Sequence, residues 1–389
     1  MLIISLDAVG ERGFDRLAGR LAFAAFLRQA ETFRRVKTLF VSNTYPVHVS
    51  VATGETPSEH GIRSNTEPFP SPHPVWNADE SSIKVKTVWQ KAYERGIDSA
   101  AVFWPVTANS LYIRRNIPEV MARPGKSQIM TSLRAGSVLL QLKMLLRHRK
   151  LLGLRNGVSQ PGLDRFAAAC MSDILRENKP GLAMVHLSAY DTICHTDGLD
   201  GAQTDEAFEY LDACLKKILE AAGDEKDAII FSDHGQIAAG AAIDPNTFLA
   251  GEGLLHPENG AYRIGGYGCF FECCGGSGFF HRGSLSHEET HKWRGRIGES
   301  EGFRRFLTEE EMNVSGYGDT AFGFCAREGY YYEAFSDGKK ANHGYPLDTP
   351  DYEVFYSVRG SGYKPGGVTA GGSLLDIAAI AEKSLGVGE

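Results

Sequence analysis

The segment Asp227-Ala228-Ile229-Ile230-Phe231-Ser232-Asp233-His234-Gly235 contains four apolar residues that are followed directly by polar side chains and a glycine. A short apolar run between a charged turn and a glycine is typical of a parallel strand that is covered on both faces. Ligand sites of open α/β sheets lie beyond the carboxyl ends of such strands. The segment therefore predicts an α/β fold and makes Asp233 and His234 candidate metal ligands. An aspartate that caps a turn beside a hydrogen-bonded histidine explains this one peptide equally well.

Two other predicted strands also lead to a carboxylate. Leu2–Leu6 is followed by Asp7, and Leu182–Leu187 is followed four residues later by Asp191. His195 comes four residues after Asp191, so the two side chains share one face of a helical turn and can hold one metal ion. These residues extend the candidate metal site to three strand ends.

A fourth polar group, Asn342-His343-Gly344-Tyr345, lies in a turn-like sequence near the end of the chain. His343 can add another imidazole to the site. Each of the four groups alone has a structural explanation. Their joint occurrence at strand and loop ends of one α/β chain favours a shared metal site over chance.

A helix is predicted to begin at Thr44, within Ser42-Asn43-Thr44-Tyr45-Pro46. This cluster combines residues typical of helix caps with a proline in the first turn. The first amides of a helix have no partner inside the helix, so they bind phosphate or another oxyanion. For Thr44 alone, a plain N-cap is the simpler interpretation.

Composition and charge limit the class of protein. The chain has 389 residues, of which 42% are hydrophobic and 23% charged, so it can bury a large core in one elaborated domain or two. Its net charge of −7 excludes a general attraction to nucleic-acid polymers. No apolar run approaches the roughly 20 residues that span a bilayer, and Met1–Leu6 lacks the basic region and the small-residue cleavage site that are typical of a signal peptide. Seven cysteines without paired spacing suggest reduced thiols, and we expect a cytoplasmic protein.

The rest of the chain continues the alternation of strands and helices. The segment Met130–Leu152 combines leucines at helical spacing with several basic residues, and it predicts either a cap or a membrane-surface helix, or more simply a helix packed on the body. His287-Glu288-Glu289-Thr290-His291 formally fits a zinc-protease motif, but its polar flanks predict an exposed segment. Other predicted helices are Glu11–Ala30, Thr87–Arg95, Leu163–Arg176 and Leu374–Leu385, and other predicted strands are Arg35–Val41 and Ala100–Phe103.

Taken together, these motifs resemble the alkaline phosphatase superfamily and, within it, the nucleotide pyrophosphatase/phosphodiesterase (type I phosphodiesterase) family. The resemblance covers most of the chain and depends on the order and spacing of the motifs. They are Ile3-Ile4-Ser5-Leu6-Asp7, Asn43-Thr44-Tyr45-Pro46-Val47-His48, Ala52-Thr53-Gly54, Pro57-Ser58-Glu59-His60-Gly61-Ile62, Trp104-Pro105, Asp191-x-x-x-His195-x-x-Gly198, Ser232-Asp233-His234-Gly235 and His343-Gly344-Tyr345. Val47 and Cys194 depart from the family pattern, which leaves the leaving-group preference open.

The resemblance implies a mostly parallel sheet between helices, formed by residues 1–245 and 341–389. It also implies a cap-like helical segment at about 121–162 and a smaller α+β subdomain at 246–340. Two zinc ions are implied, with manganese or iron as other ions that such ligands accept. Asp191, His195 and His343 would hold one ion, and Asp7, Asp233, His234 and the Thr44 hydroxyl would hold the other.

The same resemblance makes Thr44 the nucleophile that forms a covalent phospho-threonine. Asn65 matches the family's phosphate-binding asparagine and would act together with the Tyr45 amide. The Tyr45 ring matches a position that stacks on a nucleobase, and Tyr112 is a second candidate wall; core packing explains both rings equally well. No arginine lies next to Thr44 to act as a second clamp on the substrate, and Arg63 is the nearest candidate for that role, which favours a diester over a monoester.

The sequence thus predicts a two-metal phosphodiesterase or nucleotide pyrophosphatase that acts on a small phosphodiester or nucleotide. One alternative is a phosphonate hydrolase of the same superfamily, similar to phosphonoacetate hydrolase. Another is a membrane-associated binding protein that uses the basic helix and has a degenerate site. A sulfatase is disfavoured because no Cys/Ser-x-Pro-x-Arg motif is present at the nucleophile.

Overall fold

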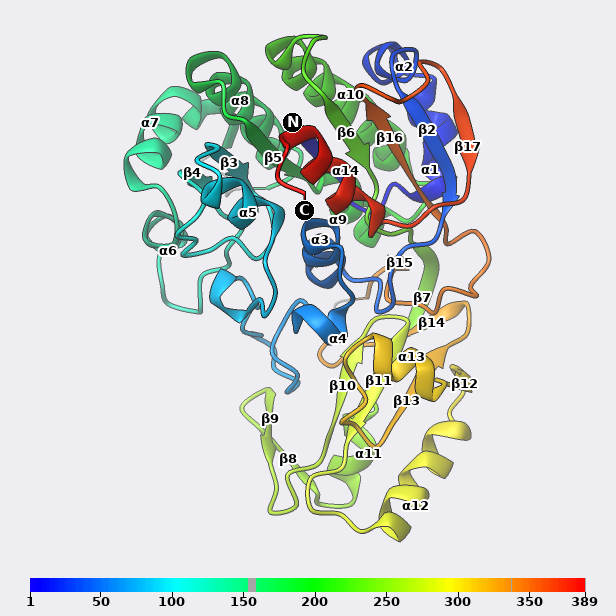
Figure 1. The fold of residues 1–389 in the computed structure, drawn as a ribbon. Helices are drawn as coiled ribbons and strands as arrows, with labels where there is room; N and C mark the ends of the chain where they lie inside the picture. Colours follow the sequence, from blue (N-terminus) through cyan, green and yellow to red (C-terminus); the bar gives the residue numbers. More distant parts are fainter. Residues whose placement is uncertain (153–158, 337, 389) are drawn as a thin grey trace.

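Strand β1 (Leu2–Leu6) lies inside an eight-stranded sheet in the computed structural model, which describes residues 1–152, 159–336 and 338–388 (Figure 1). Strand β16 is antiparallel to both of its neighbours, whereas the other pairs in this sheet are parallel. This arrangement confirms the predicted α/β fold with a mostly parallel sheet. In order across the sheet the strands are β17 (Val368–Ala370), β2 (Glu31–Val36), β16 (Val354–Arg359), β6 (Ala228–Phe231), β1, β5 (Leu182–Leu187), β3 (Ser99–Val102) and β4 (Arg115–Ile117).

Helices cover both faces of this sheet, which explains why its central strands are buried along their whole length and mostly apolar. Leu2, Ile4 and Leu6 of β1 belong to one core, and Ile3 belongs to the core on the opposite face. The first core is closed by α1 (Gly10–Ala18), α2 (Leu21–Leu27), α8 (Gly162–Asn178), α9 (Ala189–Asp197) and α10 (Ala202–Ala222). The second is closed by α3 (Thr44–Thr53), α5 (Val88–Glu94) and α14 (Asp376–Leu385).

The structure corrects the predicted elements between residues 11 and 41. The single helix predicted over Glu11–Ala30 is two helices, because Arg20 adopts an extended conformation (φ −90°, ψ 149°) between α1 and α2. The apolar pattern alone did not show this break, since both helices contribute to the same core. The strand predicted at Arg35–Val41 lies earlier, where β2 pairs with β16 and β17.

The segment Met130–Leu152 forms a helical cap beside β3 and β4 (Figure 1). It consists of α6 (Gln128–Ala135), α7 (Val138–His148) and the 3-10 helix η2 (Arg149–Leu152). The helix is interrupted at Gly136, where the backbone is so close to β4 that a Cβ atom would lie 2.5 Å from the carbonyl oxygen of Asn116. The helix predicted as continuous is therefore interrupted where its backbone approaches the end of β4.

The basic face of α7 is directed at α8 and is paired there. Lys143 pairs with Glu177, Arg147 pairs with Asp173 and Glu177, and His148 lies beside Asp173. These contacts fit the interpretation of a helix packed on the body. Among the described residues, no helix has the length and apolar content required to cross a bilayer.

A second group of elements lies below the large sheet in Figure 1 and has its own aromatic core. This core includes Phe271, Phe280, Phe322 and Phe324. His287–His291 is largely exposed on its outer helix, as predicted, so the protease motif has no buried site. We keep the division into a catalytic core and a 246–340 subdomain as a proposal.

The second group contains three small sheets and three helices within the described residues. The sheets are β14 (Gly329–Tyr332), β7 (Ile237–Ile243) and β15 (Ala341–Asn342); β10 (Phe270–Cys274), β11 (Ser277–His281), β13 (Phe322–Ala326) and β12 (Phe303–Phe306); and β8 (Leu255–Glu258) with β9 (Ala261–Ile264). The helices are α11 (Asn246–Gly251), α12 (His287–Gly298) and α13 (Glu309–Val314).

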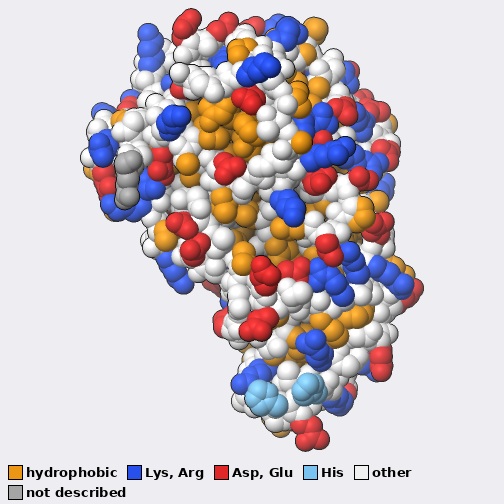
Figure 2. All heavy atoms as spheres, turned by 45° about the vertical axis from the view of Figure 1, so that its right-hand side comes forward, with side chains coloured by type: hydrophobic (Ala, Val, Ile, Leu, Met, Phe, Trp, Pro, Cys, Tyr) orange, Lys and Arg blue, Asp and Glu red, His pale blue; other side chains and the backbone are white. Residues whose placement is uncertain are grey.

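Surface charge is mixed rather than segregated. Figure 2 shows Lys and Arg side chains interspersed with Asp and Glu side chains over the face that it draws. A mixed surface provides no long-range attraction for a polyanion. An anionic substrate therefore has to be recognised by local groups.

A buried histidine near the start of the chain makes stability sensitive to acid. His60, at the end of α4 (Pro57–His60), is fully buried, lies 2.9 Å from Ser50 Oγ through Nε2, and accepts a hydrogen bond from the Ile62 amide. Burial lowers the pKa of His60 to about 4, whereas an unfolded histidine titrates near about 6.5. Its contribution to stability is therefore complete above the unfolded value and is lost as the pH falls from there towards 4.

We expect acidification from pH ~7 to ~4.5 to lower the free energy of unfolding of the parent by about 2 kcal/mol more than that of His60→Gln. Urea unfolding of both proteins at the two pH values measures this difference. Equal acid sensitivity in the two proteins would show that His60 is not held neutral by the fold.

Candidate active site

The predicted ligands meet at the carboxyl ends of the central strands. Asp7 directly follows β1, and Asp233 follows the neighbouring strand β6 by two residues. Asp191 lies in the first turn of α9, which begins just after β5 on the other side of β1. The parallel register of these three strands therefore places three carboxylates at one edge of the sheet.

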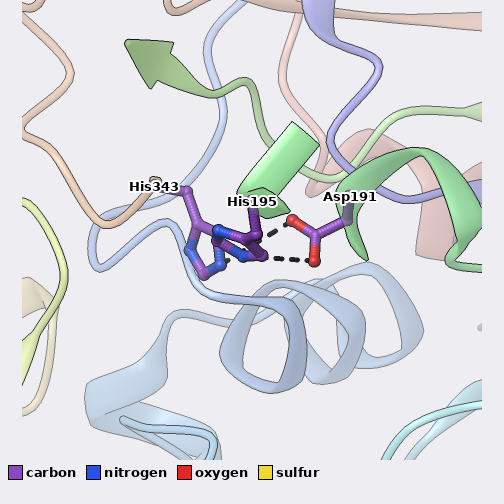
Figure 3. Close-up of side chains that lie close together, drawn as sticks. All are labelled: Asp191, His195 and His343. Atoms are coloured by element: carbon purple, nitrogen blue, oxygen red, sulfur yellow. Dashed lines mark ion pairs between the residues drawn. The ribbon is translucent and has the colours of Figure 1, made fainter. Parts of the chain in front are cut away.

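Asp191, His195 and His343 form the first cluster (Figure 3). His195 Nε2 lies 3.3 Å from Asp191 Oδ2, and His343 Nε2 lies 3.9 Å from Asp191 Oδ1. The ligand atoms of the three residues lie within 4.8 Å of one another. This spacing is compatible with one metal ion between them.

Asp7, Asp191 and His234 form a second cluster of the same dimensions. His234 Nε2 is 3.4 Å from Asp7 Oδ1 and 3.5 Å from Asp233 Oδ2. Asp191 thus lies within reach of both clusters, which the predicted division of ligands did not include. The two candidate cation positions are adjacent.

Thr44 is the first residue of α3 and lies at the second cluster. Its Oγ1 atom is 3.4 Å from His234 Nε2, and the side chain lines a cavity of about 430 Å³ together with Asp7, Asp191 and His343. Asn43, not Thr44, is the N-cap residue of α3. The hydroxyl of Thr44 therefore faces the candidate cations and has no capping role.

The buried carboxylates of the site lie close together and have oxygens without hydrogen-bond partners among the described residues, an arrangement that a bound cation would stabilise. Asp7 Oδ1 and Asp233 Oδ2 are buried and have no hydrogen-bond partner among the described residues. Burial, and then the charge of Asp233, raise the pKa of Asp7 well above its usual value. Bound cations would satisfy both oxygens, and carboxylate oxygens with imidazole nitrogens are ligands of zinc, manganese and iron.

The imidazole rings are held so that one nitrogen of each faces the clusters. His195 donates from Nδ1 to the carbonyl of Ala341 at 2.7 Å, and His343 donates from Nδ1 to Asn43 Oδ1 at 2.9 Å. These bonds leave Nε2 as the free ligand atom of each ring. Gly344 follows His343 at φ +82°, and a Cβ atom there would lie 1.9 Å from the Cys274 carbonyl, so the turn requires glycine.

A buried histidine on α3 holds the backbone of Thr44. His48 donates from Nδ1 to the carbonyl of Thr44 at 2.7 Å, and the Ser5 hydroxyl donates to its Nε2 at 2.8 Å. Burial, and then the neighbouring His186, lower the pKa of His48 to about 3, so the ring is neutral at pH ~7. His48 therefore positions the first turn of α3.

Asn65 lines the same cavity of about 430 Å³, which we call the catalytic cavity. Its contact with the Tyr45 amide differs from the one that was predicted. The Tyr45 amide donates to Asn65 Oδ1 at 2.8 Å, so it is not the free oxyanion donor that the sequence suggested. The bond fixes the Asn65 carboxamide and leaves its nitrogen available for a ligand in the cavity. Asn65 thus remains the candidate phosphate-binding residue.

Of the two predicted aromatic walls, Tyr45 lines the cavity and Tyr112 does not. The Tyr45 ring is fully buried and packs against Trp76 at a centroid distance of 5.3 Å. Tyr112 lies outside the residues that line the catalytic cavity and packs against Tyr93. We therefore withdraw Tyr112 from the site, and Trp76 and Phe69 are the aromatic side chains that line the cavity beside Tyr45.

Several residues of the site were not predicted. Gln236 donates to Asp191 Oδ1, and His186 Nε2 lies 3.1 Å from Asp7 Oδ2. Glu119 lines the cavity, and burial, followed by the charge of Asp191, raises its pKa to about 8. A histidine inside the otherwise apolar β5 was a usable signal for His186, whereas nothing in the sequence marked Glu119.

Arg63, the predicted basic residue for binding the substrate, makes its contacts outside the cavity. Arg63 pairs with Asp319, donates to the Gly316 carbonyl and lies over the Tyr317 ring. It does not line the catalytic cavity, where Lys339 is the basic residue among those described and is paired with Glu333. The protein itself therefore supplies little positive charge to a substrate.

Known proteins share both sequence and fold with this chain. The family model described as "Type I phosphodiesterase / nucleotide pyrophosphatase" matches residues 1–274. Human ectonucleotide pyrophosphatase/phosphodiesterase family member 1 is 25% identical over 111 residues, which are 27% of this chain and 12% of that protein. The chain therefore matches only a small part of the length of this relative.

Solved structures of ectonucleotide pyrophosphatase/phosphodiesterase 5 share the fold. The murine protein has a TM-score of 0.70 at 15% identity, over 99% of this chain and 95% of that chain. The human protein has a TM-score of 0.69 at 15% identity, over 100% of this chain and 95% of that chain. An inactive variant of the murine protein in complex with AMP matches with a TM-score of 0.70 at 15% identity, over 99% and 94% of the two chains. Because the family model matches more than two thirds of the chain, the protein belongs to the type I phosphodiesterase/nucleotide pyrophosphatase family.

Proposed function

We propose that the protein hydrolyses a phosphodiester or phosphoanhydride bond of a small substrate through a covalent phospho-threonine at Thr44. The observation that carries this proposal is the position of Thr44 Oγ1, 3.4 Å from His234 Nε2 and at the edge of two adjacent candidate cation sites. A hydroxyl with no capping role has no evident structural purpose there. Attack on phosphorus is the chemistry that this position favours.

Two bound metal ions, which we propose to be zinc, would lower the pKa of the hydroxyl and offset the charge of the reacting phosphoryl group. Asp191, His195 and His343 would hold one ion, and Asp7, Asp233 and His234 would hold the other beside Thr44. Their buried, unpartnered oxygens and oriented Nε2 atoms support this assignment.

The side chains of the protein orient the reacting groups. Thr44 Oγ loses its proton to solvent and forms a bond to phosphorus, while the bond to the departing alcohol or phosphate breaks and that group takes up a proton from solvent. Water then cleaves the phospho-threonine and restores the hydroxyl. His48 holds the Thr44 carbonyl, and Asn65 presents its carboxamide nitrogen to a non-bridging oxygen, a contact of the kind that stabilises developing charge.

The charge of the cavity favours a substrate with few negative charges at the reacting phosphorus. Glu67, Glu272 and Glu333 line the cavity with Lys339, which is already paired, whereas Glu119, with its pKa raised to about 8, is mostly protonated at pH ~7. A monoester dianion would meet more repulsion there than a diester monoanion. This asymmetry supports a diester or anhydride as the substrate.

Aromatic side chains at the same cavity support a nucleotide as one substrate. Trp76 and Phe69 are partly exposed and lie with prolines on the segment that follows Asn65. Flat, amphipathic rings of this kind bind nucleobases by stacking. The AMP complex of the murine relative is consistent with this assignment.

A substrate panel tests the proposal. Zinc-loaded protein is offered bis-nitrophenyl phosphate, a nitrophenyl nucleotide, nitrophenyl phosphate and phosphonoacetate. We expect kcat/KM for the two diesters to exceed that for the monoester by about 100-fold, which corresponds to roughly 3 kcal/mol of transition-state energy. A preference for phosphonoacetate would replace the proposal with a phosphonate hydrolase, and a preference for the monoester would contradict it.

A further inference from the structure

A second cavity of about 300 Å³ lies next to the catalytic cavity, under the helical cap. We call it the apolar chamber. Phe103, which follows β3, and residues of β4, β5 and α8 line one side of it, and α6 and α7 of the cap line the other, in the region at the left of Figure 1. Its apolar lining includes Phe103, Ile117, Ile129, Leu145, Leu163 and Phe166.

The apolar chamber and the catalytic cavity share a wall. Glu119 and Ser188 line both of them. His186 also lines the chamber, and its Nε2 atom lies 3.1 Å from Asp7 Oδ2. A group in the chamber is therefore separated from the candidate cation sites by single side chains.

The polar residues that α6 and α7 contribute to the lining are occupied by bonds within the cap. Ser132 donates to Gln141 Oε1 at 2.6 Å, and Gln141 donates in return to the Ser132 carbonyl at 2.9 Å. Gln128 donates to the carbonyl of Val120 at 2.7 Å. No Lys or Arg is present among the described residues that line the chamber. The chamber thus offers a mostly apolar surface without a basic side chain, and its polar groups Glu119, His186 and Ser188 lie on the side of the catalytic cavity.

We propose that the apolar chamber binds an alkyl or acyl chain of the phosphoester substrate, with the phosphoryl group at Thr44 and the chain under α6 and α7. This inference depends on the proposed function, whose substrate class it narrows. The volume lies at the lower end of the range for ligand sites, about 300–1,000 Å³, and suits a slender chain better than a second polar ring system. The Glu119–Ser188 wall is where the chain would pass from one cavity to the other.

Chain length is the variable that tests the proposal, because each buried methylene group strengthens binding by about fourfold. Calorimetric titration of zinc-loaded protein with methyl phosphate and octyl phosphate compares the same head group with and without a chain. We expect octyl phosphate to bind at least about 100-fold more tightly than methyl phosphate. Equal affinity of the two ligands would overturn the proposal.

Two pairs of neighbouring residues provide matched variants. Ile129 and Leu145 line the chamber, whereas the adjacent Met130 and Leu146 do not. Ile129 and Met130 are equally exposed, at 47%, so this pair differs in contact with the chamber and not in exposure. Ile129→Trp and Leu145→Trp should reduce the chain-length effect to less than about tenfold and leave methyl phosphate binding unchanged. Met130→Trp and Leu146→Trp should behave as the parent does; if they lost the effect equally, the chain would not lie in the chamber.

Octanol distinguishes failure of this proposal from failure of the proposed function. If the cation sites do not bind phosphate, methyl phosphate will bind neither to the parent nor to the variants. The diesters of the substrate panel will then show no turnover. Octanol has no phosphate group, so its binding to the parent and to the tryptophan variants still tests whether the chamber accepts an alkyl chain. Unchanged octanol binding in both filled variants, with melting temperatures like that of the parent, would refute the chamber as the site of the chain.

Discussion

Thr44→Ala should lower kcat/KM for a bis-nitrophenyl diester by about 10³-fold or more, because the variant lacks the oxygen that attacks phosphorus. The Thr44 side chain is only 8% exposed, and its Oγ1 atom faces His234 and the cavity. Asn43 caps α3, so the substitution removes no cap and should leave the free energy of unfolding nearly unchanged. Steady-state kinetics and urea unfolding of parent and variant measure the two effects.

Thr44→Ser is the matched control for this prediction. It keeps a hydroxyl at the first position of α3 and should retain measurable phosphorylation of residue 44, detected by mass spectrometry after rapid acid quench. Diester turnover by Thr44→Ala at the parent rate would show that the hydroxyl is not the nucleophile. A direct attack by water would then be the simpler mechanism.

His343→Ala should lower the zinc content from two ions per chain towards one and reduce diester turnover by about 10²-fold. His343 contributes one of three ligands to the first cluster, and its orienting bond to Asn43 shows that Nε2 is directed to that position. Plasma mass spectrometry of dialysed protein measures the metal, and added zinc should restore part of the activity.

His148→Ala is the control for the loss of an imidazole. His148 is also partly buried beside a carboxylate, Asp173, but it lies on the cap and outside both clusters. Its variant should keep two zinc ions and parental turnover. A full zinc content in His343→Ala would contradict the assignment of the first site.

The strand ends could be predicted from the sequence because they depend on local pattern. Ala228–Phe231 is apolar throughout, Leu2–Leu6 is apolar except for Ser5, and a carboxylate follows each within two residues, so the strands and the positions of Asp7 and Asp233 could be inferred. Parallel pairing then brings them together, as observed. The metal ligands were for this reason the part of the site that was easiest to predict from the sequence.

Other features depend on tertiary contacts that no local pattern contains. Asp191 lies within reach of both clusters because α9, which carries it, packs between α10 and β15, and the Tyr45 amide pairs with Asn65 because the segment after α4 returns to the start of α3. The helix interruptions after Gly19 and at Gly136 could not be predicted, because the sequence keeps one apolar helical face on both sides of each of them. Glu119 reaches the cavity from a loop after β4 that carries no motif.

Anomalous X-ray diffraction at the zinc edge, on crystals of the zinc-loaded protein, tests the central claim most directly. The account predicts two strong peaks in the catalytic cavity, one among Asp191, His195 and His343 and the other among Asp7, Asp233 and His234, with Thr44 Oγ beside the second. A single peak, or two peaks that lie away from these side chains, would contradict it.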